Sequence, residues 1–224
     1  MKKQKTSLIL NLINIAFILF ATLAMMFRFK FMKGEELLVS ENINVFKFFT
    51  VDSNILLLIV SIIYVIYLIL LLKQKIEVIP KWVFILKIIG TVQVGITMVV
   101  TVCFLTFITG SKWLSLFMNS NLFFHLLCPT IAFVSLIGFE HDHQTTFKEL
   151  LFSLIPLGLY SIFYTYNVLS HMENGKVSME YDFYAFAQGG ALTIIISVIT
   201  IIGLCLLLTE IINIFNKKHF KKDE

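Results

Sequence analysis

Charged residues are scarce in this chain. Only 14% of its 224 residues are Asp, Glu, Lys or Arg, whereas about 25% is usual for a soluble domain. Hydrophobic residues make up 58%, and the mean hydropathy is +0.89. A soluble fold of this length could not bury so much apolar surface, but a bilayer can cover it. The composition therefore excludes a soluble globular domain and predicts a membrane protein.

Cysteine is also rare. Cys103, Cys128 and Cys205 fall in apolar runs, without metal-ligand spacing and without a partner in a loop. They are expected to be small packing residues. The sequence therefore predicts no metal and no other cofactor.

Long apolar runs dominate what remains, and they do not alternate with polar residues as strands would. Only helices and closed barrels span lipid, so the predicted fold class is all-α, with a single six-helix transmembrane domain over residues 1–224. The expected spans are about 7–27, 51–72, 82–109, 122–139, 150–168 and 189–212. The first is interpreted as a retained span rather than a signal peptide, because its apolar core is too long and no cleavage site follows.

The distribution of basic residues predicts the orientation. Both tails and the loops 73–81 and 140–149 carry eleven lysines, against six Lys and Arg on the other side. This bias favours both termini in the cytoplasm. The net charge of +4 lies mostly at these cytoplasmic ends, where it can meet anionic headgroups, and gives no reason to expect nucleic acid as a partner. Richness in Lys, Ile, Asn and Phe suggests an AT-rich genome and hence a bacterial cytoplasmic membrane.

Polar residues mark the starts of two spans that begin on the same outer side. In "VFKFFTVDSN", residues 45–54, Thr50, Ser53 and Asn54 have i, i+3 and i+4 spacing, which places them on one helical face. On the fourth span Asn121 and His125 have i and i+4 spacing. Thr50 and His125 are therefore expected at similar depth, near the outer interface.

These residue types suit ester hydrolysis. A threonine is a poor nucleophile until a neighbouring histidine accepts its proton. Ser53, Asn54 or N–H groups at the helix start can stabilise an oxyanion, and Asn121 and Gln93 are further candidates to line the pocket. A site so near the bilayer suits a lipid-like ester whose chains stay in the membrane.

The segments "KFFTVDSN" and "NLFFHLLCP", opening a second and a fourth span, resemble the androgen-induced family of membrane hydrolases and related bacterial six-span proteins. The resemblance covers residues 46–57 and 121–139. It implies a threonine hydrolase of fatty acid esters of hydroxy fatty acids, with Thr50 and His125 as the catalytic pair. Leu122 departs from the family pattern, because eukaryotic members carry a second histidine there.

A non-catalytic interpretation stays open. Thr50 and Asp52 are ordinary N-cap residues, and Ser or Asn within spans commonly bond to neighbouring helices. The chain would then be a small transporter or a lipid-binding partner subunit. The inner halves of the second and fourth spans are almost wholly apolar, which argues against a polar path for a transporter.

Two loops hold further polar residues. In "EHDHQ", residues 140–144, His141 and His143 suit either a metal site or, as is commoner, a solvated cytoplasmic loop. The outer loop 169–188 is expected to be a hydrated lid, with its aromatic segment "YDFYAF" on the membrane interface. The polar residues assigned to this lid are His171, Glu173, Glu180 and Asp182.

Overall fold

The fold is a bundle of long helices. The structure, a computed structural model, describes residues 2–36, 38–105, 113–187 and 189–223. Within these ranges it has no β-strand, and six helices are long and apolar enough to span a membrane. The predicted all-α class and the six spans are thereby confirmed.

The helix bounds follow the predicted spans closely. The first three spans are α1 (Lys2–Met26), α2 (Phe49–Leu72) and α3 (Lys81–Val100), which continues as a π-turn, η2 (Thr101–Leu105). The fourth consists of α5 (Ser120–Leu122), a π-turn η4 (Phe123–Leu127) and α6 (Cys128–Phe139). The fifth consists of α7 (Phe147–Leu150), η5 (Leu151–Ser153) and α8 (Leu154–Ser170), and the sixth is α9 (Ala191–Asp223). Short 3₁₀ turns, η1 (Asn42–Lys47) and η3 (Trp113–Phe117), lie in the connections.

One predicted span end lies outside the described residues, and another differs from the helix in the structure. The expected end of the third span at residue 109 lies outside the described residues. The sixth helix runs to Asp223 rather than to residue 212, because the tail contains neither glycine nor proline to stop it.

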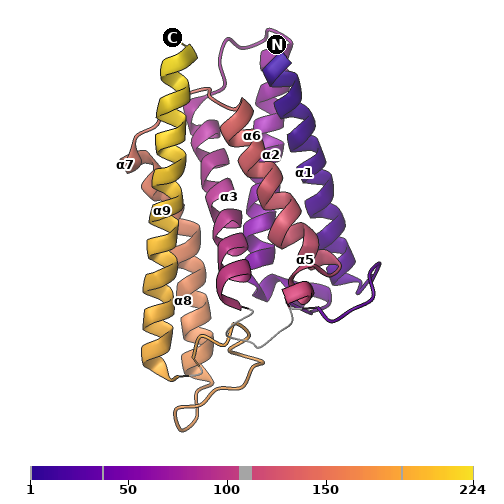
Figure 1. Cartoon of the computed structure of the whole chain (residues 1–224), viewed down its shortest axis with the longest axis vertical. Coiled ribbons are helices and arrows are strands. Elements are labelled where there is room, and N and C mark those ends of the chain that lie inside the picture. The colour runs from indigo at the N-terminus through magenta and orange to yellow at the C-terminus, as the bar shows by residue number, and fades with distance from the viewer. Residues whose placement is uncertain (1, 37, 106–112, 188, 224) are drawn as a thin grey trace.

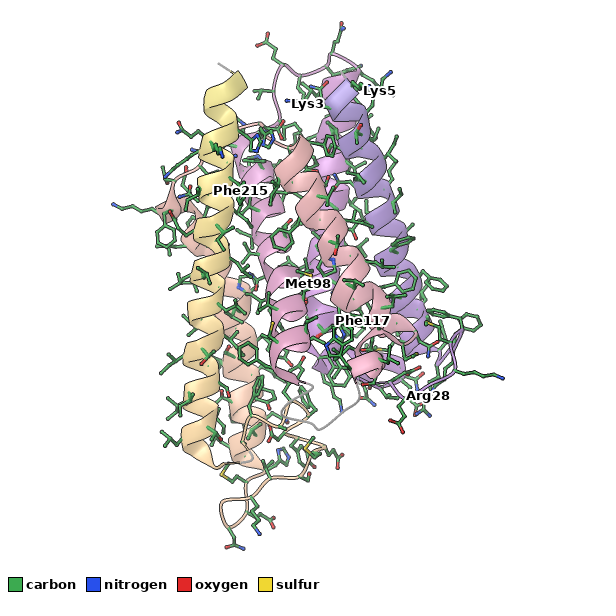
Figure 2. The ribbon with its side chains drawn as sticks, in the orientation of Figure 1. Lys3, Lys5, Arg28, Met98, Phe117 and Phe215 are labelled. Atoms are coloured by element: carbon green, nitrogen blue, oxygen red, sulfur yellow. The ribbon has the colours of Figure 1, made fainter. Side chains whose placement is uncertain are left out.

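Both termini lie at one end of the bundle, called the terminal end below, as six spans require (Figure 1). Lys3 and Lys5 lie at this end and Arg28 at the opposite one, called the Thr50 end (Figure 2). Helix α3 is central: 72% of its most apolar window is buried in the protein, against 17–39% for the other five spans. Helices α8 and α9 pack together beside it (Figure 1), and most of their apolar surface is left for lipid.

Close packing joins α2 and α3. A Cβ atom at Gly90 would lie 2.7 Å from Val60 Cγ2 and 3.3 Å from the Leu57 Cα. Glycine therefore allows the two backbones to approach, as small residues do between membrane helices.

The loop between α8 and α9 differs from its prediction. His171, Glu173 and Glu180 are exposed, as expected for a hydrated lid. Asp182 and Tyr184 are instead buried, so the prediction that this whole segment is hydrated or lies on the interface is wrong. The segment folds inward because its aromatic rings pack on those of α8, which removes them from water.

Candidate functional site

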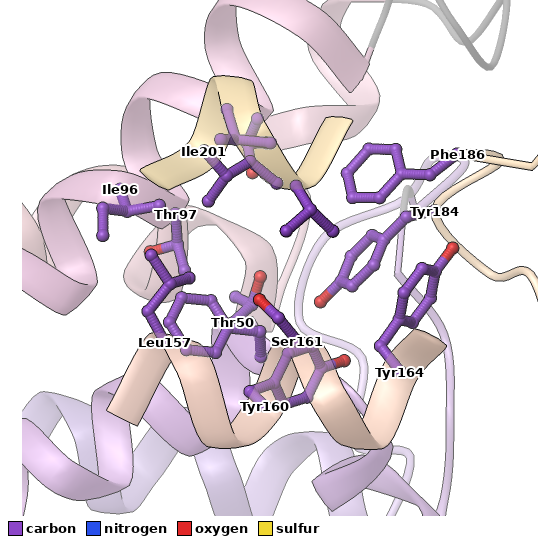
Figure 3. Close-up of a pocket in the computed structure, with 14 residues that line it drawn as sticks. Thr50, Ile96, Thr97, Leu157, Tyr160, Ser161, Tyr164, Tyr184, Phe186 and Ile201 are labelled. Carbon is purple, nitrogen blue, oxygen red and sulfur yellow. The ribbon is translucent and has the colours of Figure 1, made fainter. Parts of the chain in front are cut away.

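Thr50 lies on the wall of a pocket at the Thr50 end (Figure 3). The cavity between its walls has a volume of about 50 Å³. Its walls are apolar side chains and hydroxyl groups from α2, α3, η2, α8, α9 and the loop before α9. This Thr50 pocket is lined by Phe49, Thr50, Ile96, Thr97, Val100, Thr101, Leu157, Tyr160, Ser161, Tyr164, Tyr184, Phe186, Val198 and Ile201.

Thr50 is not a cap of helix α2. The N-cap position is taken by Phe48, whose side chain makes no capping hydrogen bond. Asp52 falls in the first turn, where its charge suits the positive end of the helix dipole, rather than at the cap. The interpretation of Thr50 or Asp52 as N-cap residues is therefore wrong, and the Thr50 side chain, only 2% exposed, borders the pocket.

Ser53 and Gln93 line a different cavity, a groove of about 370 Å³ between α2 and α8 that also contains Asp52. The Ser53 hydroxyl donates to the Thr50 carbonyl at 3.1 Å. The Gln93 side-chain N–H donates to the Ser153 carbonyl at 2.8 Å, while its Oε1 is buried and has no partner in the part of the chain that the structure describes. Neither side chain lines the Thr50 pocket, although Phe49 and Tyr160 belong to both walls.

Asn54 connects α2 to the start of the fourth span. In the π-turn the Cys128 N–H donates to the Phe123 carbonyl, five residues earlier. In the same pattern the Phe124 carbonyl would accept from the N–H of residue 129, but this residue is a proline and has no N–H. Asn54 Nδ2 donates to this Phe124 carbonyl at 3.4 Å and to the Thr50 carbonyl at 2.8 Å. Its amide N–H groups are thus used in the fold and not held for an oxyanion.

His125 is fully buried next to this contact, in the π-turn η4. Its Nδ1 lies 3.2 Å from the Leu116 carbonyl, which can only accept, so Nδ1 carries the proton and Nε2 has the lone pair. Nε2 is buried and has no hydrogen-bond partner among the described residues. This is the tautomer that a general base requires.

Asn121 anchors the loop before η1, because its Nδ2 donates to the Leu38 carbonyl at 3.2 Å. Asn121 and His125 are buried and, like Asn54, are not part of the Thr50 pocket wall. The predicted single wet pocket is therefore divided. Successive residues of a helix are about 100° apart around its axis, so Ser53 and Asn54 lie on opposite sides of Thr50. Ser53 therefore faces the groove beside α8, and Asn54 faces the fourth span.

A second polar cluster, which sequence reasoning missed, lies toward the terminal end. Lys87, on α3, is fully buried, and its Nζ donates to Asn11 Oδ1 at 2.6 Å and to Ser61 Oγ at 2.9 Å. The same amide of Asn11 donates through Nδ2 to Glu140 Oε1 at 2.7 Å, so it bridges the two charged groups. Further members are Ser7 and Ser135, whose hydroxyls donate to Glu140 Oε1 at 2.9 and 2.5 Å. These six residues form the Lys87 cluster.

The inner halves of the second and fourth spans, expected to be almost wholly apolar, contribute only Ser61 and Ser135 to this cluster. Most of its polar atoms come from α1, α3 and the end of α6 rather than from α2 and the start of the fourth span. Ser7, Asn11 and Asn14 have i, i+4 and i+7 spacing on the buried face of α1. That stripe, with a lysine inside the third span, was the signal in the sequence that could have revealed the cluster.

The "EHDHQ" segment is only partly a solvated loop. Glu140 is buried in the Lys87 cluster, and the Asp142 carboxylate accepts from the Tyr64 hydroxyl at 2.7 Å. The His141 ring stacks on His219 at 4.7 Å, and His143 Nε2 bonds to the Ile79 carbonyl. Among the described residues, no three His, Cys, Asp or Glu side chains are grouped to hold a metal ion.

Comparison of the chain with protein-family models, curated proteins and solved structures finds no match.

Proposed function

We propose that this chain is an intramembrane hydrolase of lipid-like esters, with Thr50 as nucleophile and His125 as general base. The observation that carries the proposal is the Thr50 pocket: a buried threonine on a wall otherwise made of apolar side chains and hydroxyls. Apolar walls with a few placed polar groups are typical of small-molecule sites. The apolar lining suits a fatty acyl chain, which would enter as the walls of this small cavity move apart, and the ester carbonyl would lie beside Thr50.

The state of His125 supports its role. A buried acceptor without a partner loses its hydration with no compensation, typically about 1–3 kcal/mol, and such groups are retained mainly where they have a task. The Asn54 bond to the Phe124 carbonyl keeps α2 against η4 at the level of the pair. Proton transfer needs Thr50 Oγ1 within about 2.6–3.2 Å of Nε2, or one bridging water, and catalytic contacts often tighten only when substrate binds.

The reaction then has two halves. Thr50 Oγ1 bonds to the ester carbonyl carbon while its proton passes to His125 Nε2. The tetrahedral intermediate collapses, the bond to the alcohol oxygen breaks, and that oxygen takes the proton from His125. Water, deprotonated by the same Nε2, attacks the acyl-Thr50 ester, and the departing Thr50 oxygen recovers its proton.

Covalent labelling of membranes with a fluorophosphonate probe tests this proposal. Thr50→Ala and His125→Asn are each expected to reduce the labelling rate by at least about 10²-fold, since a positioned general base contributes about 10²–10⁴-fold. Thr97→Ala is the matched control: Thr97 lines the same pocket, but its hydroxyl donates to the Val94 carbonyl at 2.7 Å. Labelling that survives in Thr50→Ala would exclude Thr50 as the nucleophile.

A small transporter is the second candidate, favoured by the Lys87 cluster. Ionisable residues at membrane depth commonly belong to substrate or proton pathways. In that case Lys87→Gln would abolish uptake of the transported solute by vesicles, while Thr50→Ala would leave it unchanged. The opposite pattern, loss of ester hydrolysis only in Thr50→Ala, supports the hydrolase.

A further inference from the structure

A buried carboxylate fixes the loop that closes the Thr50 pocket. Asp182 accepts hydrogen bonds from the main-chain N–H groups of Phe186, at 2.9 Å, and Ala187, at 3.0 Å. It also accepts from the Tyr164 hydroxyl on α8. These bonds from two elements hold the turn 182–187 in one position against α8.

The turn directs Tyr184 into the pocket. The Tyr184 ring packs on Tyr164, with centroids 5.6 Å apart, and only 6% of the residue is exposed. Figure 3 shows its hydroxyl pointing toward the side of the pocket where Thr50 and Ser161 lie. This hydroxyl is buried and has no hydrogen-bond partner among the described residues. A buried donor at the pocket wall that makes no hydrogen bond to the described residues is suited to an acceptor on the ligand.

The neighbours of this hydroxyl place it at the start of α2. Burial raises the pKa of Tyr184 to about 12, and the nearby hydroxyls of Tyr160 and Thr50 and the main-chain N–H groups of Thr50 and Phe49 oppose that rise. The first N–H groups of a helix have no partner within the helix. Because the phenol stays protonated at neutral pH, it remains a hydrogen-bond donor beside Thr50.

We infer that the Tyr184 hydroxyl stabilises the oxyanion formed when Thr50 attacks an ester carbonyl. This inference rests on the proposed hydrolase function. As the Thr50 oxygen bonds to the carbonyl carbon, the electron pair of the C=O double bond moves to oxygen, which accepts a hydrogen bond from Tyr184 O–H without taking its proton. Ser53 and Asn54, the donors predicted from sequence, are engaged with the Thr50 and Phe124 carbonyls.

Tyr184→Phe tests the inference, because it removes the donor and keeps the ring. With p-nitrophenyl octanoate as substrate, kcat is expected to fall about 10²-fold, as for loss of one oxyanion donor, with KM changed by less than about twofold. The fluorophosphonate labelling rate should fall in parallel. Tyr166→Phe is the matched control, since Tyr166 lies on α8 with 73% of its surface exposed, and its kcat should be that of the original chain.

A second variant covers the case in which Tyr184→Phe does not fold. With 3-fluorotyrosine at position 184, the donor and the shape are kept but the phenol is more acidic, so the alkaline loss of kcat should move to lower pH. An unchanged kcat in Tyr184→Phe, or an unmoved alkaline limb in the fluorinated protein, overturns the inference. If Thr50-dependent labelling persists at the same time, the proposed function still stands. If the chain shows no Thr50-dependent labelling, the proposed function fails and this inference fails with it.

Discussion

The Lys87 cluster and the Thr50 pocket are both polar sites among spanning helices, but their polar atoms are satisfied to different degrees. In the cluster, Lys87, Asn11 and Glu140 bond in a chain, and only Glu140 Oε2 lacks a partner within the described ranges of the chain. At the Thr50 end, the Tyr184 hydroxyl in the pocket and His125 Nε2, which lies outside the pocket wall, both lack a partner among the described residues. The polar groups of the cluster bond to one another, whereas these two groups at the Thr50 end have no partner among the residues that the structure describes.

On the proposed function, this difference separates a structural role of the cluster from a chemical role of the pocket. A polar network whose members bond to one another fixes the position of the helices that contribute to it, here α1, α2, α3 and α6. Unpaired buried groups weaken the fold, and they persist mainly at sites that bind or react. Substitutions in the cluster should therefore change stability, and substitutions in the pocket should change activity.

The largest expected effect on stability is at Lys87. Lys87→Met removes the donor to Asn11 and Ser61 and the positive charge that Asn11 links to the buried Glu140, and it should destabilise the protein by about 3–5 kcal/mol, measured by reversible unfolding in detergent micelles. Lys87→Met combined with Glu140→Gln should recover most of that loss, because no unpaired charge remains. Thr50→Ala should change the unfolding free energy by less than about 1 kcal/mol. Equal stability of Lys87→Met and the original chain would contradict the structural role.

A smaller effect is expected at Asp182, which links the fold to the pocket. Asp182→Asn weakens its bonds to Phe186, Ala187 and Tyr164 and should cost about 1.5–3 kcal/mol, the range for hydrogen bonds to a charged group. It should also lower kcat, because the turn that positions Tyr184 loosens. Glu180→Gln in the same loop is the control, since Glu180 is exposed. Thermal unfolding and ester hydrolysis of both variants measure the two effects, and a stable, fully active Asp182→Asn would refute them.

The smallest effect is a pH dependence at the terminal end. Burial raises the pKa of Asp142 to about 6, the nearby Glu140 adds to the rise, and the hydrogen bond from Tyr64 and the charge of His143 oppose it. The folded state then binds the proton more tightly than the unfolded state, so this contribution to stability is complete below about pH 4 and is lost as the pH rises to about 6.

We expect a decrease of about 1 kcal/mol over that interval, since one pKa unit corresponds to about 1.4 kcal/mol and Asp142 is partly exposed. The free energy of unfolding, measured at several pH values, should lose this slope in Asp142→Asn and keep it in Glu173→Gln. A slope of opposite sign would show that the Asp142 carboxylate is stabilised in the fold.

Much of the architecture could be predicted because hydropathy and helix length are local properties. Apolar runs about 20 residues long predict spans wherever they occur, and an even number of spans places both termini at one end. The same count predicts that α2 and the fourth span start at one end, and the Asn54 bond to Phe124 joins them there. The catalytic roles of Thr50 and His125 stay a prediction that labelling will test.

The sequence by itself therefore determined the membrane class, the six helices and the end at which Thr50 and His125 lie. Only the tertiary structure decided which polar groups meet: Lys87 with Asn11, and Tyr184 with the start of α2. It also decided that Ser53 and Asn54, neighbours in sequence, serve different cavities and helices. The physical reason is that side-chain contacts between helices depend on how each helix is rotated and on where each loop folds back. Both are set by packing over the whole bundle and not by any local run of residues.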